Sequence, residues 1–158
     1  MEQYPENYTK QLQRLLALVS DSKKHYQHAA ENLKSSEFKD LLKQYVVERE
    51  NIIVELKEKI ASMGGDPDED EHGFLSILHR GWLEMKAKAA GKGDQELLEA
   101  CRNTDQALLD GYDDVLQGTL LEHSDLKTFV SGQRLAVNES FSELDRHYFN
   151  LFNTNNSL

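Results

Sequence analysis

Apolar residues recur every three or four positions along most of this chain, and this periodicity limits what it can fold into more than any other feature. Such spacing aligns the apolar side chains in one stripe of an α-helix. Four long stripes run through about residues 7–33, 36–63, 94–118 and 122–152, and a shorter one runs through about 74–90. No segment alternates apolar and polar residues, so the sequence predicts an all-α protein without strands.

The segments between the stripes carry signals that start and end helices. Ser35 or Ser36 can cap the second helix, and Gly64-Gly65 supplies the left-handed residue that often follows a helix. Asp94 is the predicted N-cap of the fourth helix. Because so few residues separate the first two stripes, the first two helices must form an antiparallel hairpin.

The long connection between residues 64 and 94 determines how the two halves are arranged. It contains about 17 helical residues, roughly 25 Å of helix, so it can carry the chain back along the bundle. The order hairpin, crossover, hairpin is that of ferritin-like bundles. We therefore expect residues 1–152 to form a single ferritin-like four-helix bundle, with a short fifth helix in the crossover and a frayed tail at 153–158. A five-helix up-and-down bundle is the alternative.

Charge and composition exclude several functions. The chain has 18 basic and 28 acidic residues, a formal net charge of −10, which argues against nucleic acid and anionic membrane surfaces as partners. No segment approaches 18 uncharged apolar residues and the N-terminus lacks the pattern of a leader, so we expect a cytoplasmic protein. The single cysteine, Cys101, excludes an internal disulfide and a cysteine-based metal centre.

Both stripes of the first hairpin are interrupted at mid-helix. The first helix has Ser22 and Lys23 there, and the second has Glu48 and Arg49. Lys23 lies 12 residues before the turn at Ser35 and Glu48 lies 13 after it, so the two side chains share one height. We predict a Lys23–Glu48 ion pair, or a hydrogen-bonded layer, that fixes the register of the hairpin.

A polar layer at mid-bundle is also where ferritin-like proteins hold metal ions, with a Glu from each of two helices and a Glu-x-x-His from each of the other two. The one Glu-x-x-His of this sequence, Glu69 to His72, lies in an acidic loop. The carboxylates near mid-height, Glu48, Asp105 and Glu139, have no paired histidine. The sequence therefore predicts no metal, no cofactor and no catalytic site; an iron-binding or oxidase-type bundle that uses these three carboxylates is the alternative.

Two histidines of the first helix, His25 and His28, lie three residues apart beside Glu31. This spacing suits a surface metal, but on an acidic helix face it is more typical of solvated polar residues. We therefore assign them no function.

The crossover contains a less generic string around the only tryptophan. Trp82 and Leu78 can pin the crossover helix to the bundle, while Arg80 and Lys86 reach acids on neighbouring helices. Tryptophan and arginine are also enriched at the centres of protein interfaces. We therefore expect His79, Arg80 and Trp82 to contribute to a contact between subunits.

The order of these parts resembles a known family. The features that carry the resemblance are Gly64-Gly65-Asp66-Pro67, Leu78-His79-Arg80-Gly81-Trp82, Gly91-Lys92-Gly93-Asp94, Cys101 and Tyr112. They are similar to a bacterial ferritin-like four-helix-bundle family catalogued as domain of unknown function 2383, over about residues 12–146. The resemblance implies a ferritin-like fold, a cytoplasmic bacterial protein and self-association, and it implies no established activity.

The chain departs from that family's usual pattern at the places most like a site; for example, Glu139 stands where members often have a histidine. We therefore expect a non-enzymatic bundle that forms a homodimer or larger homo-oligomer and keeps the ferritin-like frame without its metal chemistry. A role in a stress response follows from fold-level analogy alone.

Overall fold

Five helices make up the part of the protein that the structure describes, as the sequence predicts. The computed structural model describes residues 6–69, 74–89, 91, 93–118 and 123–152. The helices are α1 (Glu6–Asn32), α2 (Ser36–Ser62), α3 (Phe74–Ala89), α4 (Asp94–Gln117) and α5 (Ser124–Phe152). No strand occurs among the described residues. The predicted start of the fifth helix at 122 and the predicted tail at 153–158 lie outside them.

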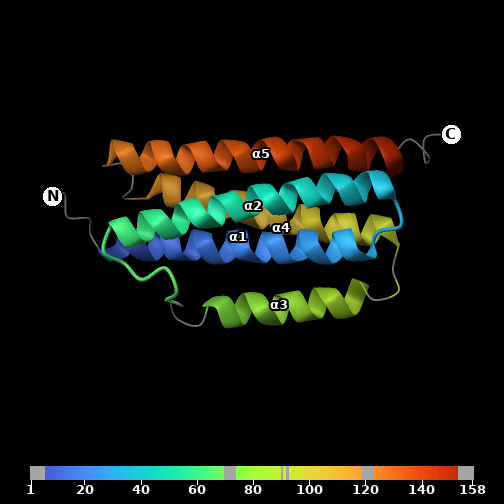
Figure 1. The fold of residues 1–158 in the computed structure, drawn as a ribbon, viewed down its shortest axis with the longest axis horizontal. Coiled ribbons are helices and arrows are strands. Elements are labelled where there is room, and N and C mark those ends of the chain that lie inside the picture. The colour runs from blue at the N-terminus through green and yellow to red at the C-terminus, as the bar shows by residue number, and fades with distance from the viewer. Residues whose placement is uncertain (1–5, 70–73, 90, 92, 119–122, 153–158) are drawn as a thin grey trace.

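The four long helices run side by side as two hairpins, and α3 lies outside them (Figure 1). The chain runs one way along α1, returns along α2, and is carried back by the crossover so that α4 runs parallel to α2. Helix α4 packs against both α1 and α5. The order hairpin, crossover, hairpin is thus confirmed, and α3 is a crossover helix rather than a fifth helix of the core.

The helix ends show which of the predicted capping residues cap a helix. The Oγ of Ser35 accepts a hydrogen bond from the backbone N–H of Phe38 at 3.3 Å and caps α2. Gly64 follows α2 with a φ of 85°, a conformation that glycine adopts without strain. The prediction for Asp94 was wrong, because Gly93 is the N-cap of α4 and its cap position makes no side-chain hydrogen bond.

Asp94 instead joins the start of α4 to the turn of the first hairpin. Its carboxylate accepts the backbone N–H of Lys34 at 2.8 Å and that of Ser35 at 3.0 Å. Both donors lie in the turn just before α2, and Ser35 is the N-cap, whose N–H has no partner within the helix. This carboxylate therefore fixes the first hairpin against the second.

The apolar core is divided into two clusters. One contains residues 8–19 of α1, 52–60 of α2, 108–115 of α4 and 126–137 of α5; the other contains residues 26–33, 38–45, 97–101 and 144–148 of the same helices. Between them, each long helix contributes a buried polar side chain: Ser22, Arg49, Asp105 and Ser140. The predicted interruption of the stripes is therefore a continuous polar layer across the bundle.

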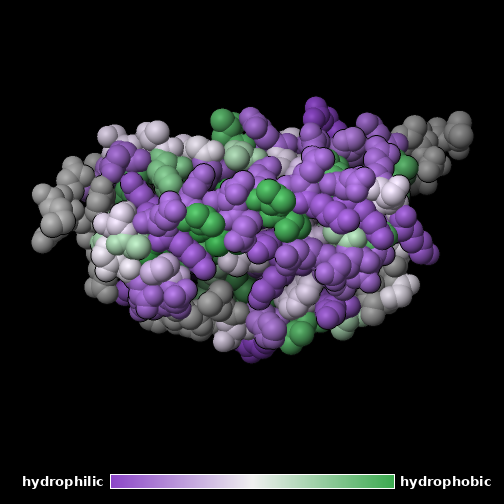
Figure 2. Space-filling view, viewed as in Figure 1, coloured by the Kyte–Doolittle hydropathy of each residue, from purple (hydrophilic) through white to green (hydrophobic). Residues whose placement is uncertain are grey.

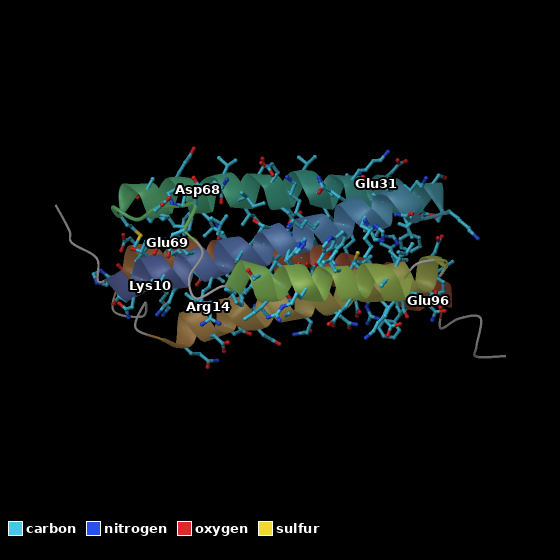
Figure 3. All side chains as sticks on the ribbon, turned by 90° about the horizontal axis from the view of Figure 1, so that it is seen from below. Lys10, Arg14, Glu31, Asp68, Glu69 and Glu96 are labelled. Carbon is cyan, nitrogen blue, oxygen red and sulfur yellow. The ribbon has the colours of Figure 1, made fainter. Side chains whose placement is uncertain are left out.

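Helix α3 covers the seam between α1 and α4 (Figure 3). Trp82 meets the ring edges of His25 and His28, with ring centroids 5.1 and 5.2 Å away. Near the other end of α3, the guanidinium of Arg14 lies over the ring of Phe74 at 5.0 Å. These contacts confirm that Trp82 pins the crossover helix to its own bundle.

No helix of the described residues is long and apolar enough to span a membrane.

Candidate functional site

Arg49 lies at the centre of the polar layer, and its side chain has no exposed surface. Its Nη2 donates to Asp105 Oδ2 at 3.0 Å and to Ser140 Oγ at 2.9 Å. Its Nε donates to Ser22 Oγ at 3.1 Å, and its Nη1 donates to Glu48 Oε1 at 2.8 Å. One guanidinium therefore bonds to side chains of all four long helices.

Asp105 is the negative partner of Arg49 and is equally buried. Its Oδ1 accepts a hydrogen bond from Ser22 Oγ at 2.7 Å, and its Oδ2 accepts one from the hydroxyl of Tyr26 in addition to that from Arg49. A buried charge is tolerable only when it is paired and hydrogen-bonded, and Asp105 meets both conditions. The serine and tyrosine of α1 thus complete the ion pair between α2 and α4.

The electrostatics hold these groups in single protonation states. Burial alone would lower the pKa of Arg49, but Asp105, Tyr26 and Glu48 together outweigh it and the pKa is raised. Burial and the neighbouring Asp105 raise the pKa of Tyr26 well above its ordinary value. The same two causes raise the pKa of the Cys101 thiol. Tyr26 and Cys101 therefore stay neutral, and none of the three side chains is suited to proton transfer near neutral pH.

The layer reaches the molecular surface at Glu48. Its carboxyl group is half-buried, and burial raises its pKa despite the opposing charge of Arg49. One turn away, the hydroxyl of Tyr45 donates to Glu143 Oε1 at 2.6 Å. This second bond also joins α2 to α5, so polar contacts hold these two helices together at the layer and beside it.

The predicted Lys23–Glu48 ion pair is corrected by the structure. Lys23 Nζ pairs with Glu50 Oε2 at 2.5 Å on a partly exposed edge of the hairpin, and Glu48 pairs with Arg49. Successive residues of a helix are rotated by about 100°. With Arg49 facing the core, Glu48 and Glu50 project to opposite sides, and Lys23 lies on the side of Glu50.

The three carboxylates of the alternative iron site do not converge. Asp105 is bonded to Arg49, Ser22 and Tyr26; Glu48 is bonded to Arg49; and Glu139 is exposed. No group of three His, Cys, Asp or Glu side chains within the described ranges could hold a metal ion. His72 of the loop motif lies outside those ranges. A permanently charged guanidinium stands where a bundle metal would need anionic ligands, so these residues do not fit one.

The predicted contact residues of α3 divide into two groups. His79 and Arg80 are exposed, whereas Trp82 is half-buried against α1. Neither Arg80 nor Lys86 forms an ion pair with a described acid, so that part of the prediction was wrong. The expectation of a solvated face at His25 was also wrong, because α3 covers this residue and leaves it 6% exposed.

Taken together, these features define an all-α bundle built around a buried arginine–aspartate layer. The chain belongs to the family described as "Domain of unknown function (DUF2383)", whose model matches residues 7–118. The match covers α1 to α4 and confirms the resemblance seen in the sequence. No curated protein and no solved structure matches the chain.

Proposed function

We propose that this protein is a non-enzymatic, self-associating, ferritin-like bundle in which an ion-pair layer replaces the metal centre of that fold class. The observation that carries the proposal is the position of Arg49, whose bonds to Asp105 and Ser140 reach across the bundle. Arginine keeps its charge at any physiological pH. A layer of this kind fixes the register of four helices and supplies neither a nucleophile nor an open ligand position.

Self-association is supported by the outward face of α3. Arg80 and Leu83 lie three residues apart, on the side of the helix turned away from Trp82, and Leu83 is 49% exposed. Ile77 on the same helix is 54% exposed. In a chain with a net charge of −10, an exposed arginine beside apolar side chains favours an acidic surface of a second copy.

A second apolar surface lies on α2, where Val47 and Val54 are exposed one heptad apart. Figure 2 shows hydrophobic side chains in the middle of the face that α2 presents and at the edge where α3 lies. We assign the subunit contact to α3 because it combines apolar side chains with a basic residue. The α2 surface then provides a matched comparison.

Native mass spectrometry of protein purified without chelator tests both parts of the proposal. We expect an integral multiple of the chain mass with no stoichiometric metal. In sedimentation velocity, the double variant Arg80→Glu/Leu83→Glu should shift the protein towards monomer with its helical circular dichroism unchanged, and Val47→Glu/Val54→Glu should not. Stoichiometric iron or manganese would overturn the metal-free assignment, and a monomeric parent protein would overturn self-association. Dissociation by the α2 variant alone would move the contact to α2.

The family resemblance supports a cytoplasmic bacterial protein, and a role in a stress response rests on fold-level analogy.

A further inference from the structure

A cavity of about 530 Å³ lies between α1, α3 and α4, beside Trp82 and separate from the polar layer. Its volume is within the range of small-molecule sites, which is about 300–1,000 Å³. Met85, Ala100 and Ala107 provide apolar wall. Helix α3 lies over the α1–α4 seam without closing it, so the cavity is open to solvent.

The inner wall of the cavity contains two polar atoms without hydrogen-bond partners. His25 lines it and is 6% exposed, yet its Nδ1 has no partner in the part of the chain that the structure describes. Asp21, one turn earlier on α1, also lines it, and its Oδ1 is likewise buried without a hydrogen bond. Leaving buried polar atoms unsatisfied costs free energy, so such a pair is uncommon unless something else binds there.

Both atoms are acceptors. His25 Nε2 lies 3.6 Å from Asp21 Oδ1, so we assign the imidazole proton to Nε2, where it faces the carboxylate. Nδ1 then presents a lone pair, and Asp21 presents a carboxylate oxygen. A group that satisfies either atom must donate a hydrogen bond, as an ammonium group does.

The rim of the cavity has the same preference for a cation. Three further acids, Glu84, Glu96 and Glu99, line it, and Lys88 is the one lysine or arginine among the described residues that do so. Figure 3 shows Glu96 near the C-terminal end of α3, where the seam opens. Carboxylates inside and at the opening attract a positively charged ligand and repel an anion.

The spacing of the acids indicates the shape of the ligand. Ser22 binds Asp105, and α1 and α4 run in opposite directions, so Asp21 lies near the height of Gln106 on α4. Glu99 is seven residues from Gln106, or about 10 Å along the helix. A diamine with about five methylene groups and a hydrogen bond to a carboxylate at each end spans this distance, and its chain matches the apolar wall between the two acids. We propose that this cavity binds a short aliphatic diamine, with one ammonium group at Asp21, beside His25, and the other at Glu99.

Calorimetric titration with 1,5-diaminopentane at physiological salt tests this site. We expect saturable one-to-one binding, and about tenfold weaker binding of pentylamine, which lacks the second ammonium group. Glu99→Gln at the rim and Asp21→Asn inside should each weaken diamine binding about tenfold. Glu58→Gln, at an exposed position of α2 outside the cavity, removes the same charge and should leave affinity unchanged.

The ring of His25 provides a readout in the parent protein, because its imidazole ¹⁵N resonances should shift in proportion to diamine occupancy. A variant at the same residue is a second test: His25→Phe keeps an aromatic ring against Trp82 and should bind the diamine more weakly. No heat of binding would show that only water fills the cavity and would overturn the proposal. Equal weakening of binding by Glu58→Gln, or binding without a shift of the His25 resonances, would also overturn the proposal. In either case the amine would be attracted by the overall negative charge of the protein and not bound at this site.

Discussion

Arg49 and Asp105 meet at 3.0 Å in the centre of the bundle, and neither side chain exposes any surface to solvent. They belong to different hairpins, so their pairing joins the two halves of the chain. Ser22, Tyr26, Glu48 and Ser140 supply the other hydrogen bonds of the two side chains. The pair therefore fixes the register of the two hairpins, and its own charges are balanced by the same contacts.

The first prediction is that Asp105→Asn is strongly destabilising. It leaves the guanidinium of Arg49 buried without a negative partner, which costs about 3–5 kcal/mol of the free energy of unfolding. Urea denaturation followed by circular dichroism measures this loss. Arg49→Met should cost a similar amount, and the double variant Arg49→Met/Asp105→Leu should recover much of it, because apolar residues can replace a buried pair. A double variant that loses as much stability as Arg49→Met and Asp105→Leu lose separately would contradict this account.

The second prediction compares two pairs at the edge of the hairpin. The Lys23–Glu50 pair is partly exposed, so a double-mutant cycle with Lys23→Met and Glu50→Gln should give a coupling of about 0.2–1 kcal/mol. The cycle with Lys23→Met and Glu48→Gln should give no coupling, because Glu48 bonds to Arg49 instead. A larger coupling to Glu48 would show that Lys23 faces the other side of α2.

The third prediction concerns the bond between the start of α4 and the first hairpin. Asp94→Ala removes the acceptor of two backbone N–H groups at the turn and should cost about 1–2 kcal/mol of stability. Glu96→Ala is the matched control, because it removes an acid from the same first turn of α4 and so changes the helix-dipole term equally. Equal effects of the two variants on urea midpoints would mean that Asp94 acts through the dipole alone.

Much of the polar layer could be predicted from the sequence. Each of its four members lies three or four residues from an apolar residue on either side and so continues an apolar stripe. The members are the middle residues of the triplets 19–22–26, 45–49–52, 101–105–108 and 137–140–144. The sequence therefore places Arg49 and Asp105 inside the bundle. Their pairing could have been inferred from charge, since they are the only ionisable residues among the four.

The sequence could not determine which charged neighbours pair at the edge of the layer. Counting from the turn locates Lys23, Glu48 and Glu50 along the hairpin, but the pairing depends on the rotation of each helix about its own axis. Nor could it predict the burial of His25, because that depends on α3 lying over the α1–α4 seam. Placement of a crossover helix is a tertiary property that periodicity does not encode.

The last prediction concerns the pH dependence of stability at His28, which packs against Trp82. Burial and the nearby charge of Lys86 lower its pKa below the ordinary value of 6.5, although Glu31 opposes them. The unfolded chain therefore takes up the proton first, so stability from this residue is present above about pH 6.5 and is lost as the pH falls towards the lower pKa of the folded state. His28→Gln should make the fall in stability between about pH 7 and 5 shallower, as measured by urea midpoints across that range. A control variant at exposed His79, which lies away from Trp82's contact with α1, should leave the slope unchanged. A steeper slope in His28→Gln would reverse the sign of the linkage and show that the folded protein favours the charged imidazole.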